Sequence, residues 1–171
     1  SLHKYPEIEI SMNVDLDDLY NADMMKLITK QLYRHRGLAN RLSFEILESK
    51  EIKDYDEVAL IFQQLKTFGS KIAIDDFGSG YASYVYLIKL DIDILKIDGS
   101  LIEELSFSPE RTKIMLSSIN DLAERYQYRV VAEFVSSKEI YEMVSELGIE
   151  YSQGYYLGEP KLLESYLDKK E

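Results

Sequence analysis

The sequence predicts an α/β fold in which a parallel β-sheet is covered by helices. Short apolar runs typical of strands alternate with stretches of helical spacing along the chain. The strand-like runs are rich in Ile, Val and Leu, which indicates strands buried on both faces. Because no linker or low-complexity stretch interrupts this pattern, residues 1–171 are expected to form a single domain. About six β/α units fit either an open doubly wound sheet or part of an eight-unit barrel.

The strands are predicted from apolar runs that are too short for helices and rich in β-branched residues. They are expected at residues 7–14, 42–47, 71–74, 92–97 and 129–131, with a last short strand that starts at Tyr151.

The helices are predicted where apolar residues recur every three or four positions. One of these segments stops at Gly69, and another starts with Ser108 as its cap and Pro109 at its first helical position. The predicted helices are residues 16–36, 55–68, 83–89, 109–126, 137–147 and 161–167.

The composition narrows the chemistry and the partners. A net charge of −11 argues against nucleic acid polymers and anionic membranes as partners. The chain has no cysteine, which excludes thiol chemistry, and its only histidines are His3 and His35, which argues against a histidine-rich zinc site. No apolar run is long enough to span a bilayer, and the start does not resemble a signal peptide. The expected location is therefore the cytoplasm, although a longer parent chain can carry a membrane anchor elsewhere.

The most distinctive stretch is residues 72–81, IAIDDFGSGY, an apolar run that ends in two acids and opens into a glycine-rich turn. Adjacent carboxylates such as Asp75 and Asp76 repel each other unless positive charge lies beside them. A pair of divalent metal ions is a common reason for such an arrangement. The simpler alternative is an Asp-rich turn in which Asp75 caps the next segment.

Polar side chains also follow the other predicted strands, at the point where each strand ends. Because the carboxyl ends of parallel strands meet at one edge, these side chains are expected to gather there. Carboxylate and amide oxygens suit two hard cations. A lysine in this set either extends to the surface or orients a metal-bound water and neutralises a phosphate. The strand-end residues are Asn13, Glu45, Asp75, Asp76, Lys96, Glu133 and Gln153, with Glu48 just beyond Glu45.

Six segments resemble the EAL-domain phosphodiesterases, which hydrolyse cyclic di-GMP. The resemblance extends over almost the whole chain and implies a (β/α)8 barrel of the TIM type, incomplete here, with a two-metal site that uses Mg²⁺ or Mn²⁺. The segments are SMNVD (11–15), FEILES (44–49), DDFGSGYAS (75–83), LKIDGSLI (95–102), VAEFVSS (131–137) and SQGYYLGEP (152–160).

The resemblance implies a role for each strand-end residue. Asn13 and Glu45 would bind one metal, and Asp75 would bridge both. The second metal would be bound by Asp76 and Glu133, of which Glu133 also belongs to the catalytic set. The implied reaction is the two-metal hydrolysis of cyclic di-GMP to linear pGpG.

The resemblance also assigns the remaining polar residues. Lys96 would hold the attacking water, and Gln153 would support the water or nearby polar groups. Glu48 would anchor the loop of residues 77–83, which links the site to a dimer interface in this family. The implied partners are cyclic di-GMP, a second copy of the chain, and a sensory or GGDEF-type domain N-terminal to it in the parent protein.

The chain departs from the family at two places. The Glu-Ala-Leu tripeptide is absent, and the first strand resembles the third strand of the family, so about two leading units of the barrel are missing. The usual Glu-Gly-Val-Glu segment reads Glu133-Phe134-Val135-Ser136. The resemblance therefore implies the C-terminal part of a longer EAL barrel, inactive or weakly active by itself. Because an incomplete barrel exposes two sheet edges, the isolated chain is expected to associate, to close partially or to cover its edges with a terminal segment.

Two other interpretations stay open. The first is a degenerate, non-catalytic EAL domain that binds cyclic di-GMP or a protein partner as a regulator, which Phe134, Ser136 and the missing strand support. The second is an enolase-like barrel enzyme with carboxylate-bound Mg²⁺, in which Lys96 abstracts a proton next to a carboxylate.

Overall fold

The centre of the fold is a six-stranded sheet in which every neighbouring pair of strands is parallel. The computed structural model describes residues 5–47, 52, 54–78, 84–163 and 165. The order of the strands in space is their order in sequence, as in a β/α barrel, whereas a doubly wound sheet reverses direction part-way. The strands are β1 (Ile10–Asn13), β2 (Leu42–Leu47), β3 (Lys71–Phe77), β4 (Ile94–Ile97), β5 (Arg129–Ala132) and β6 (Tyr151–Ser152).

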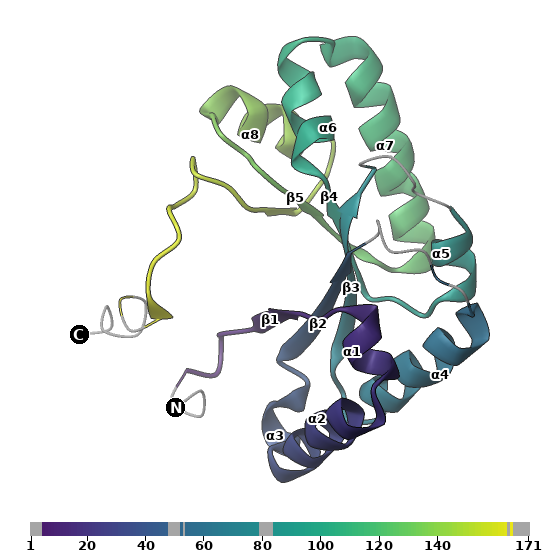
Figure 1. Cartoon of the computed structure of the whole chain (residues 1–171). Coiled ribbons are helices and arrows are strands. Elements are labelled where there is room, and N and C mark those ends of the chain that lie inside the picture. The colour runs from purple at the N-terminus through teal and green to yellow at the C-terminus, as the bar shows by residue number, and fades with distance from the viewer. Residues whose placement is uncertain (1–4, 48–51, 53, 79–83, 164, 166–171) are drawn as a thin grey trace.

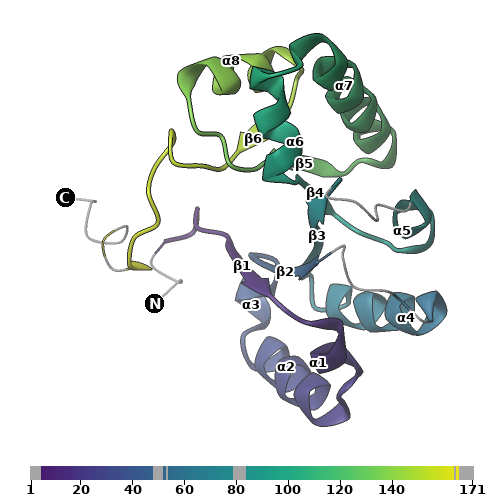
Figure 2. The same ribbon diagram turned by 45° about the horizontal axis from the view of Figure 1, so that its top comes forward.

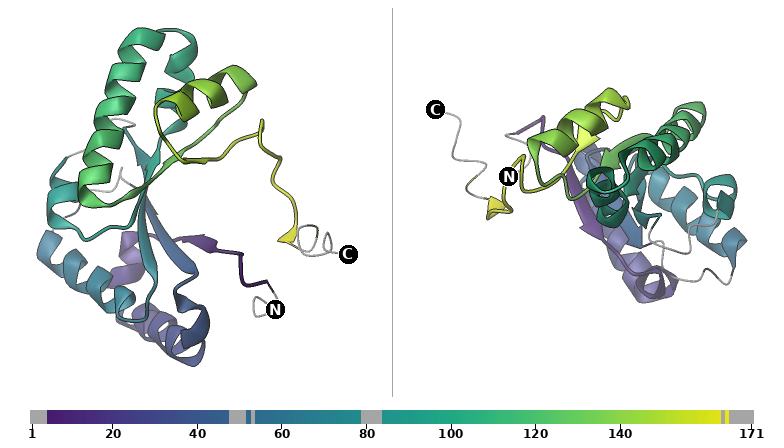
Figure 3. Two further views of the ribbon diagram at one scale, coloured as in Figure 1. Left: turned by 180° about the vertical axis from the view of Figure 1, so that it is seen from behind. Right: turned by 90° about the horizontal axis from the view of Figure 1, so that it is seen from above.

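The helices lie on the outer side of the curved sheet, so the molecule is a half-barrel (Figures 1 and 2). The segments that lead into β1 and away from β6 both lie at its open side (Figure 3). The helices are α1 (Leu16–Tyr20), α2 (Ala22–Arg34), α3 (Arg36–Ala39), α4 (Tyr55–Lys66), α5 (Tyr84–Lys89), α6 (Gly99–Glu103), the 3-10 turn η2 (Glu104–Ser106), α7 (Pro109–Tyr126) and α8 (Lys138–Glu146).

The main core lies between the sheet and the helices. Phe44 and Ile46 of β2 are fully buried there, as are Ile72 and Ile74 of β3. Successive side chains of a strand point to opposite faces, so the residues between them face the concave side of the half-barrel. In β2 and β3 those residues are small or polar, and this places Glu45 and Asp75 on the concave side.

The predicted fold class and the predicted positions of the main elements are confirmed, and the differences concern element ends and short helices. The predicted helix 16–36 is divided at Asn21, because the Asn21 side chain accepts hydrogen bonds from the amides of Asp23 and Met24 and so caps α2. The short helices α3 and α6 were not predicted, since they hold too few residues for an apolar period. Of the predicted helix 161–167, residues 164, 166 and 167 lie outside the described residues.

Two predicted helix boundaries depend on residues with restricted or unusual backbone angles. Pro109 is the first residue of α7, although the Ser108 side chain makes no capping hydrogen bond. Gly69 follows α4 with a φ of 91°, a backbone angle that residues other than glycine rarely adopt. None of the helices in the described part of the chain is long and apolar enough to cross a membrane.

Candidate active site at the carboxyl edge of the sheet

A β-bulge at the end of β3 brings two neighbouring aspartates to one side of the sheet. Ile74 pairs with Leu95 and Phe77 pairs with Ile97, so Asp75 and Asp76 stand opposite the single residue Lys96. In a regular strand, adjacent side chains point to opposite faces. Here Asp76 takes a left-handed φ of 58°, and the extra residue turns its carboxylate toward the concave side. The strand prediction ended at residue 74 and missed this bulge.

The ammonium of Lys96 lies at the centre of the site. Its Nζ donates hydrogen bonds to Asp75 Oδ1 at 2.8 Å and to Glu45 Oε2 at 2.9 Å. It also lies 2.8 Å from Glu133 Oε1. The four residues come from β2, β3, β4 and the residue after β5, and their side chains are at most 13% exposed. One buried lysine therefore joins three carboxylates, two from strands β2 and β3 and one from the residue after β5.

A second set of carboxylates overlaps the first. Asp75, Asp76 and Glu133 each offer one oxygen, and these oxygens lie within 4.8 Å of one another. With Glu45, the site contains four carboxylates around a single ammonium. We call Glu45, Asp75, Asp76, Lys96 and Glu133 the acidic cluster. Its negative charge exceeds its positive charge, so it is suited to additional cations.

The electrostatics of the acidic cluster follow from burial and from mutual repulsion. Burial raises the pKa of the Glu133 carboxyl to about 7, against the opposing effect of Lys96. The pKa of Asp76 is also raised, first by burial and then by the neighbouring Asp75 carboxylate. Burial alone would lower the pKa of Lys96, but hydrogen bonds to Asp75, Glu133 and Glu45 raise it above its ordinary value. The lysine is therefore a permanent cation at neutral pH.

The remaining predicted site residues lie beside the acidic cluster or outside the described part of the chain. Asn13 is the register partner of Glu45, and both line a hollow of about 270 Å³ with Asp75. Gln153 lines a different hollow on the other side of the edge. Glu48 lies outside the described residues, as do residues 79–83 of the loop that it was expected to anchor.

The hollow beside Gln153 is a feature whose shape the sequence did not predict. It has a volume of about 380 Å³ and is lined by Phe134, Tyr155 and Ser136 among others. The side chains of Phe134 and Tyr155 are 59% and 70% exposed, so both rings offer free surface. The one sign of this hollow in the sequence was Phe134, which stands where the family usually has a glycine.

Phe134 depends on a close contact with Gly99. It takes a left-handed φ of 52°, which is unusual for a bulky residue. A Cβ at Gly99 would lie 2.4–2.7 Å from three atoms of the Phe134 side chain. Only glycine at position 99 leaves room for Phe134 in this position.

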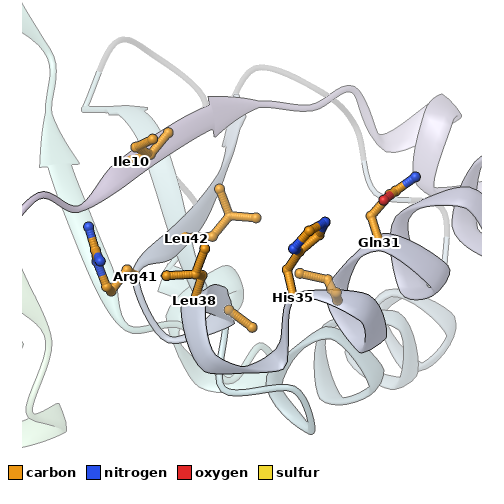
Figure 4. A pocket seen from close by; sticks show the side chains of 8 residues that line it. Ile10, Gln31, His35, Leu38, Arg41 and Leu42 are labelled. Atoms are coloured by element: carbon orange, nitrogen blue, oxygen red, sulfur yellow. The ribbon is translucent and has the colours of Figure 1, made fainter. Parts of the chain in front are cut away.

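A separate apolar hollow of about 330 Å³ lies on the outer side of β1. Figure 4 shows that Ile10, Leu38 and Leu42 converge on it from β1, α3 and β2. The Arg41 guanidinium at its border donates hydrogen bonds to the carbonyls of Ile8 and Tyr5. This hollow contains no cluster of polar groups that could carry out a reaction, so the acidic cluster is the stronger candidate site.

The donor set of the acidic cluster fits Mg²⁺ or Mn²⁺. Both cations prefer carboxylate, carbonyl and water oxygens, and the cluster offers carboxylate oxygens from several strands with no histidine or thiolate. The described residues are therefore able to hold hard divalent cations at the carboxyl edge.

A family model for the EAL domain matches residues 1–160. The chain belongs to the EAL domain family. This confirms the resemblance drawn from the sequence and argues against the enolase-like alternative.

Several characterised proteins are similar to this EAL domain. "Cyclic di-GMP phosphodiesterase PdeF" of Escherichia coli is 36% identical over 168 residues, which are 98% of this chain and 22% of PdeF. The crystal structure of the EAL domain of Mycobacterium smegmatis DcpA has a TM-score of 0.86 at 27% identity, covering 94% of this chain and 72% of that one. The PaMucR phosphodiesterase in its c-di-GMP complex has a TM-score of 0.85 at 31% identity, covering 96% of this chain and 66% of that one. The chain thus spans about a fifth of the length of PdeF.

Proposed function

We propose that this EAL domain hydrolyses cyclic di-GMP to linear pGpG with two divalent cations, Mg²⁺ or Mn²⁺. The observation that carries the proposal is the bulged Asp75–Asp76 pair, whose carboxylates meet that of Glu133 within 4.8 Å. The anionic substrate needs local positive charge to approach a protein of net charge −11. Cations bound at the acidic cluster would supply this charge, polarise a phosphate oxygen and lower the pKa of a water.

The proposed ligand set follows the positions of the side chains. Asn13 and Glu45 are paired on neighbouring strands and would hold one cation. Asp75, which lines their hollow and also belongs to the acid triplet, would bridge to the second cation. Asp76 and Glu133 would complete that second position.

In the proposed reaction, Lys96 orients the attacking water and Gln153 supports it from the neighbouring hollow. The water oxygen forms a bond to phosphorus while the bond from phosphorus to O3′ breaks. The water gives up a proton to a neighbouring carboxylate, and O3′ leaves as a hydroxyl after gaining a proton. The ring opens at one phosphodiester, so the product is linear pGpG.

The hollow between Phe134 and Tyr155 is the proposed position of a guanine base. It lies beside Gln153 and next to Glu133 in sequence, so a base in it can remain attached to a phosphate at the acidic cluster. Stacking of a base on an exposed aromatic ring contributes about 1–3 kcal/mol.

Turnover with matched variants tests this function. The chain is incubated with cyclic di-GMP and Mn²⁺, product is followed by chromatography, and Asp75→Ala is the control. We expect no appreciable product from the 171-residue chain by itself, because the resemblance to the family implies two further β/α units and a further Glu ligand in a complete barrel. A fusion that places two β/α units of a related EAL domain before Ile10 is expected to release pGpG in a metal-dependent way. A folded fusion that binds Mn²⁺ without releasing pGpG would contradict catalysis.

The second candidate function is a regulator that binds cyclic di-GMP without hydrolysing it. Phe134 and Ser136, in place of the family's glycine and second glutamate, favour this alternative. Calorimetry that detects binding of cyclic di-GMP to the same fusion, without product, would identify it.

We also infer that the domain acts within a longer, self-associating protein. PdeF is several times longer than this chain, and the resemblance implies a sensory or GGDEF-type domain before it. Within the described residues, β1 and β6 each pair on one side only, and open sheet edges favour association. Light scattering checks this expectation, and a monomer that binds no apolar dye would contradict it.

A further inference from the structure

Lys96 has no free hydrogen-bond donor in this arrangement. A lysine ammonium has three N–H groups. The Lys96 Nζ has three carboxylate partners at 2.8–2.9 Å, and its side chain is 7% exposed. Each partner comes from a different strand or strand end, so the lysine links neighbouring strands β2 to β5 across the concave side. It is therefore as much a structural cross-link as a reactive group.

The oxygens that hold Lys96 belong to the carboxylates that would hold a divalent cation. Asp75 and Glu133 contact the ammonium and also form the acid triplet with Asp76. Removing a buried cation from three carboxylates would leave their repulsion uncompensated. Conversely, a second cation brought to the same oxygens is repelled by the ammonium beside them.

We propose that Lys96 is a built-in counter-ion that competes with the divalent cation for the carboxylates of the acidic cluster. The ammonium keeps Glu45, Asp75 and Glu133 together before metal binds. When metal takes up carboxylate lone pairs, Lys96 gives up at least one of its three hydrogen bonds. This inference rests on the proposed function only in requiring that a divalent cation binds at the acidic cluster.

The exchange gives Lys96 a second state that the reaction can use. An N–H group released from a carboxylate becomes able to donate to the attacking water or to a phosphate oxygen. Lys96 thus couples metal binding to the exposure of a hydrogen-bond donor. The lysine weakens metal binding, and in return the metal-free site stays assembled.

Mn²⁺ calorimetry on three proteins tests this competition. The test variant is Lys96→Met, which keeps the length of the side chain and removes its charge. The matched control is Lys71→Met, which makes the same change at the other end of the half-barrel, where Lys71 contacts Glu9. The control changes the net charge of the protein equally, so it accounts for long-range attraction of Mn²⁺. Thermal midpoints are measured for each protein with and without Mn²⁺.

Lys96→Met is expected to bind Mn²⁺ at least about tenfold more tightly than the wild type, because a cation next to the bound metal is gone. Without Mn²⁺, the thermal midpoint of Lys96→Met is expected to be lower than that of the wild type. On addition of Mn²⁺, the midpoint of Lys96→Met is expected to rise by more than that of the wild type. Lys71→Met is expected to bind Mn²⁺ as the wild type does. If Lys96→Met is unfolded without metal, its helix content is followed by circular dichroism as Mn²⁺ is added, in place of the thermal midpoint. Recovery of helix on addition of Mn²⁺ would then support the competition.

Three results would overturn the inference. The first is equal or weaker Mn²⁺ binding by Lys96→Met than by the wild type, which would leave the proposed metal site intact. The second is a Lys96→Met protein that stays unfolded at millimolar Mn²⁺. The third is the absence of saturable Mn²⁺ binding in all three proteins, which would overturn the metal site of the proposed function as well.

Discussion

The two ends of the half-barrel carry inverse arrangements of charge. At the carboxyl end, one ammonium contacts three carboxylates, and all of these side chains are at most 13% exposed. At the amino end, one carboxylate, that of Glu9, contacts Lys71 at the start of β3 and Arg129 at the start of β5. These three side chains are 26–44% exposed.

The difference in burial and in charge balance is what favours the carboxyl end as the functional site. Exposed ion pairs such as those of Glu9 cost little to form and contribute little to stability. A buried cluster with more carboxylates than cations is expensive to hold, so folding stability alone does not account for it. On this argument we propose that the carboxyl end binds an additional cation, whereas at the amino end the charge of Glu9 is balanced by Lys71 and Arg129.

The largest expected effect is that of Asp75→Asn on metal binding. Mn²⁺ affinity is expected to fall more than about 100-fold, since even the loss of groups that only support metal ligands costs about 10–100-fold. The free energy of unfolding of the metal-free protein is expected to rise, by up to about 2 kcal/mol, because one buried negative charge is removed. Titration followed by electron paramagnetic resonance, together with urea unfolding, measures both. Unchanged Mn²⁺ affinity would place the metal elsewhere.

The next effect concerns backbone strain, which is also found at the carboxyl end. Gly99→Ala is expected to destabilise the protein by about 1–3 kcal/mol, because the added Cβ would overlap the Phe134 side chain. In a Phe134→Gly background the same change is expected to cost much less, since the ring is gone and glycine suits the positive φ. Urea unfolding of the four proteins of this cycle measures the coupling. Equal costs in both backgrounds would show that the contact is unimportant.

The smallest expected effect is that of Glu9→Gln. It is expected to lower the free energy of unfolding by less than about 1 kcal/mol, as is usual for exposed ion pairs, and to leave Mn²⁺ affinity unchanged. Chemical unfolding and metal titration check the two parts. A loss of Mn²⁺ binding in this variant would remove the distinction between the two ends.

The same carboxylate gives the amino end a defined pH dependence. Hydrogen bonds from Lys71 and Arg129 lower the pKa of Glu9 in the folded protein. Its stabilising contribution is therefore complete above the ordinary pKa of a glutamate and is lost as the pH falls through the lowered value. Urea midpoints of the wild type and Glu9→Gln should differ at neutral pH and converge as the pH falls below the ordinary pKa of a glutamate. A difference that persists in acid would exclude Glu9 as its cause.

The sequence predicted most of the fold because the strand runs are short, apolar and regularly spaced. The convergence of Glu45, Asp75, Lys96 and Glu133 could also be predicted, since parallel strands bring their carboxyl ends to one edge. The bulge at Asp76 could not, because a register shift depends on pairing between distant strands rather than on local pattern.

The partners of the charged residues were the least predictable feature. Nothing in the sequence indicates that Lys96 contacts three carboxylates, or that Glu9 lies between the starts of β3 and β5. Such contacts are set by the curvature of the sheet, which determines which inward-facing side chains meet. The hollow beside Phe134 is of the same kind, because it depends on the close approach of Gly99.

We propose that the surplus of carboxylates at the carboxyl end is a site for divalent cations. A crystal of this chain grown with Mn²⁺, and measured for anomalous scattering from manganese, tests it most directly. We expect a peak within bonding distance of Asp75 and Glu133 and no peak beside Glu9. A map with no peak at the acidic cluster, or with manganese only elsewhere on the molecule, would contradict it.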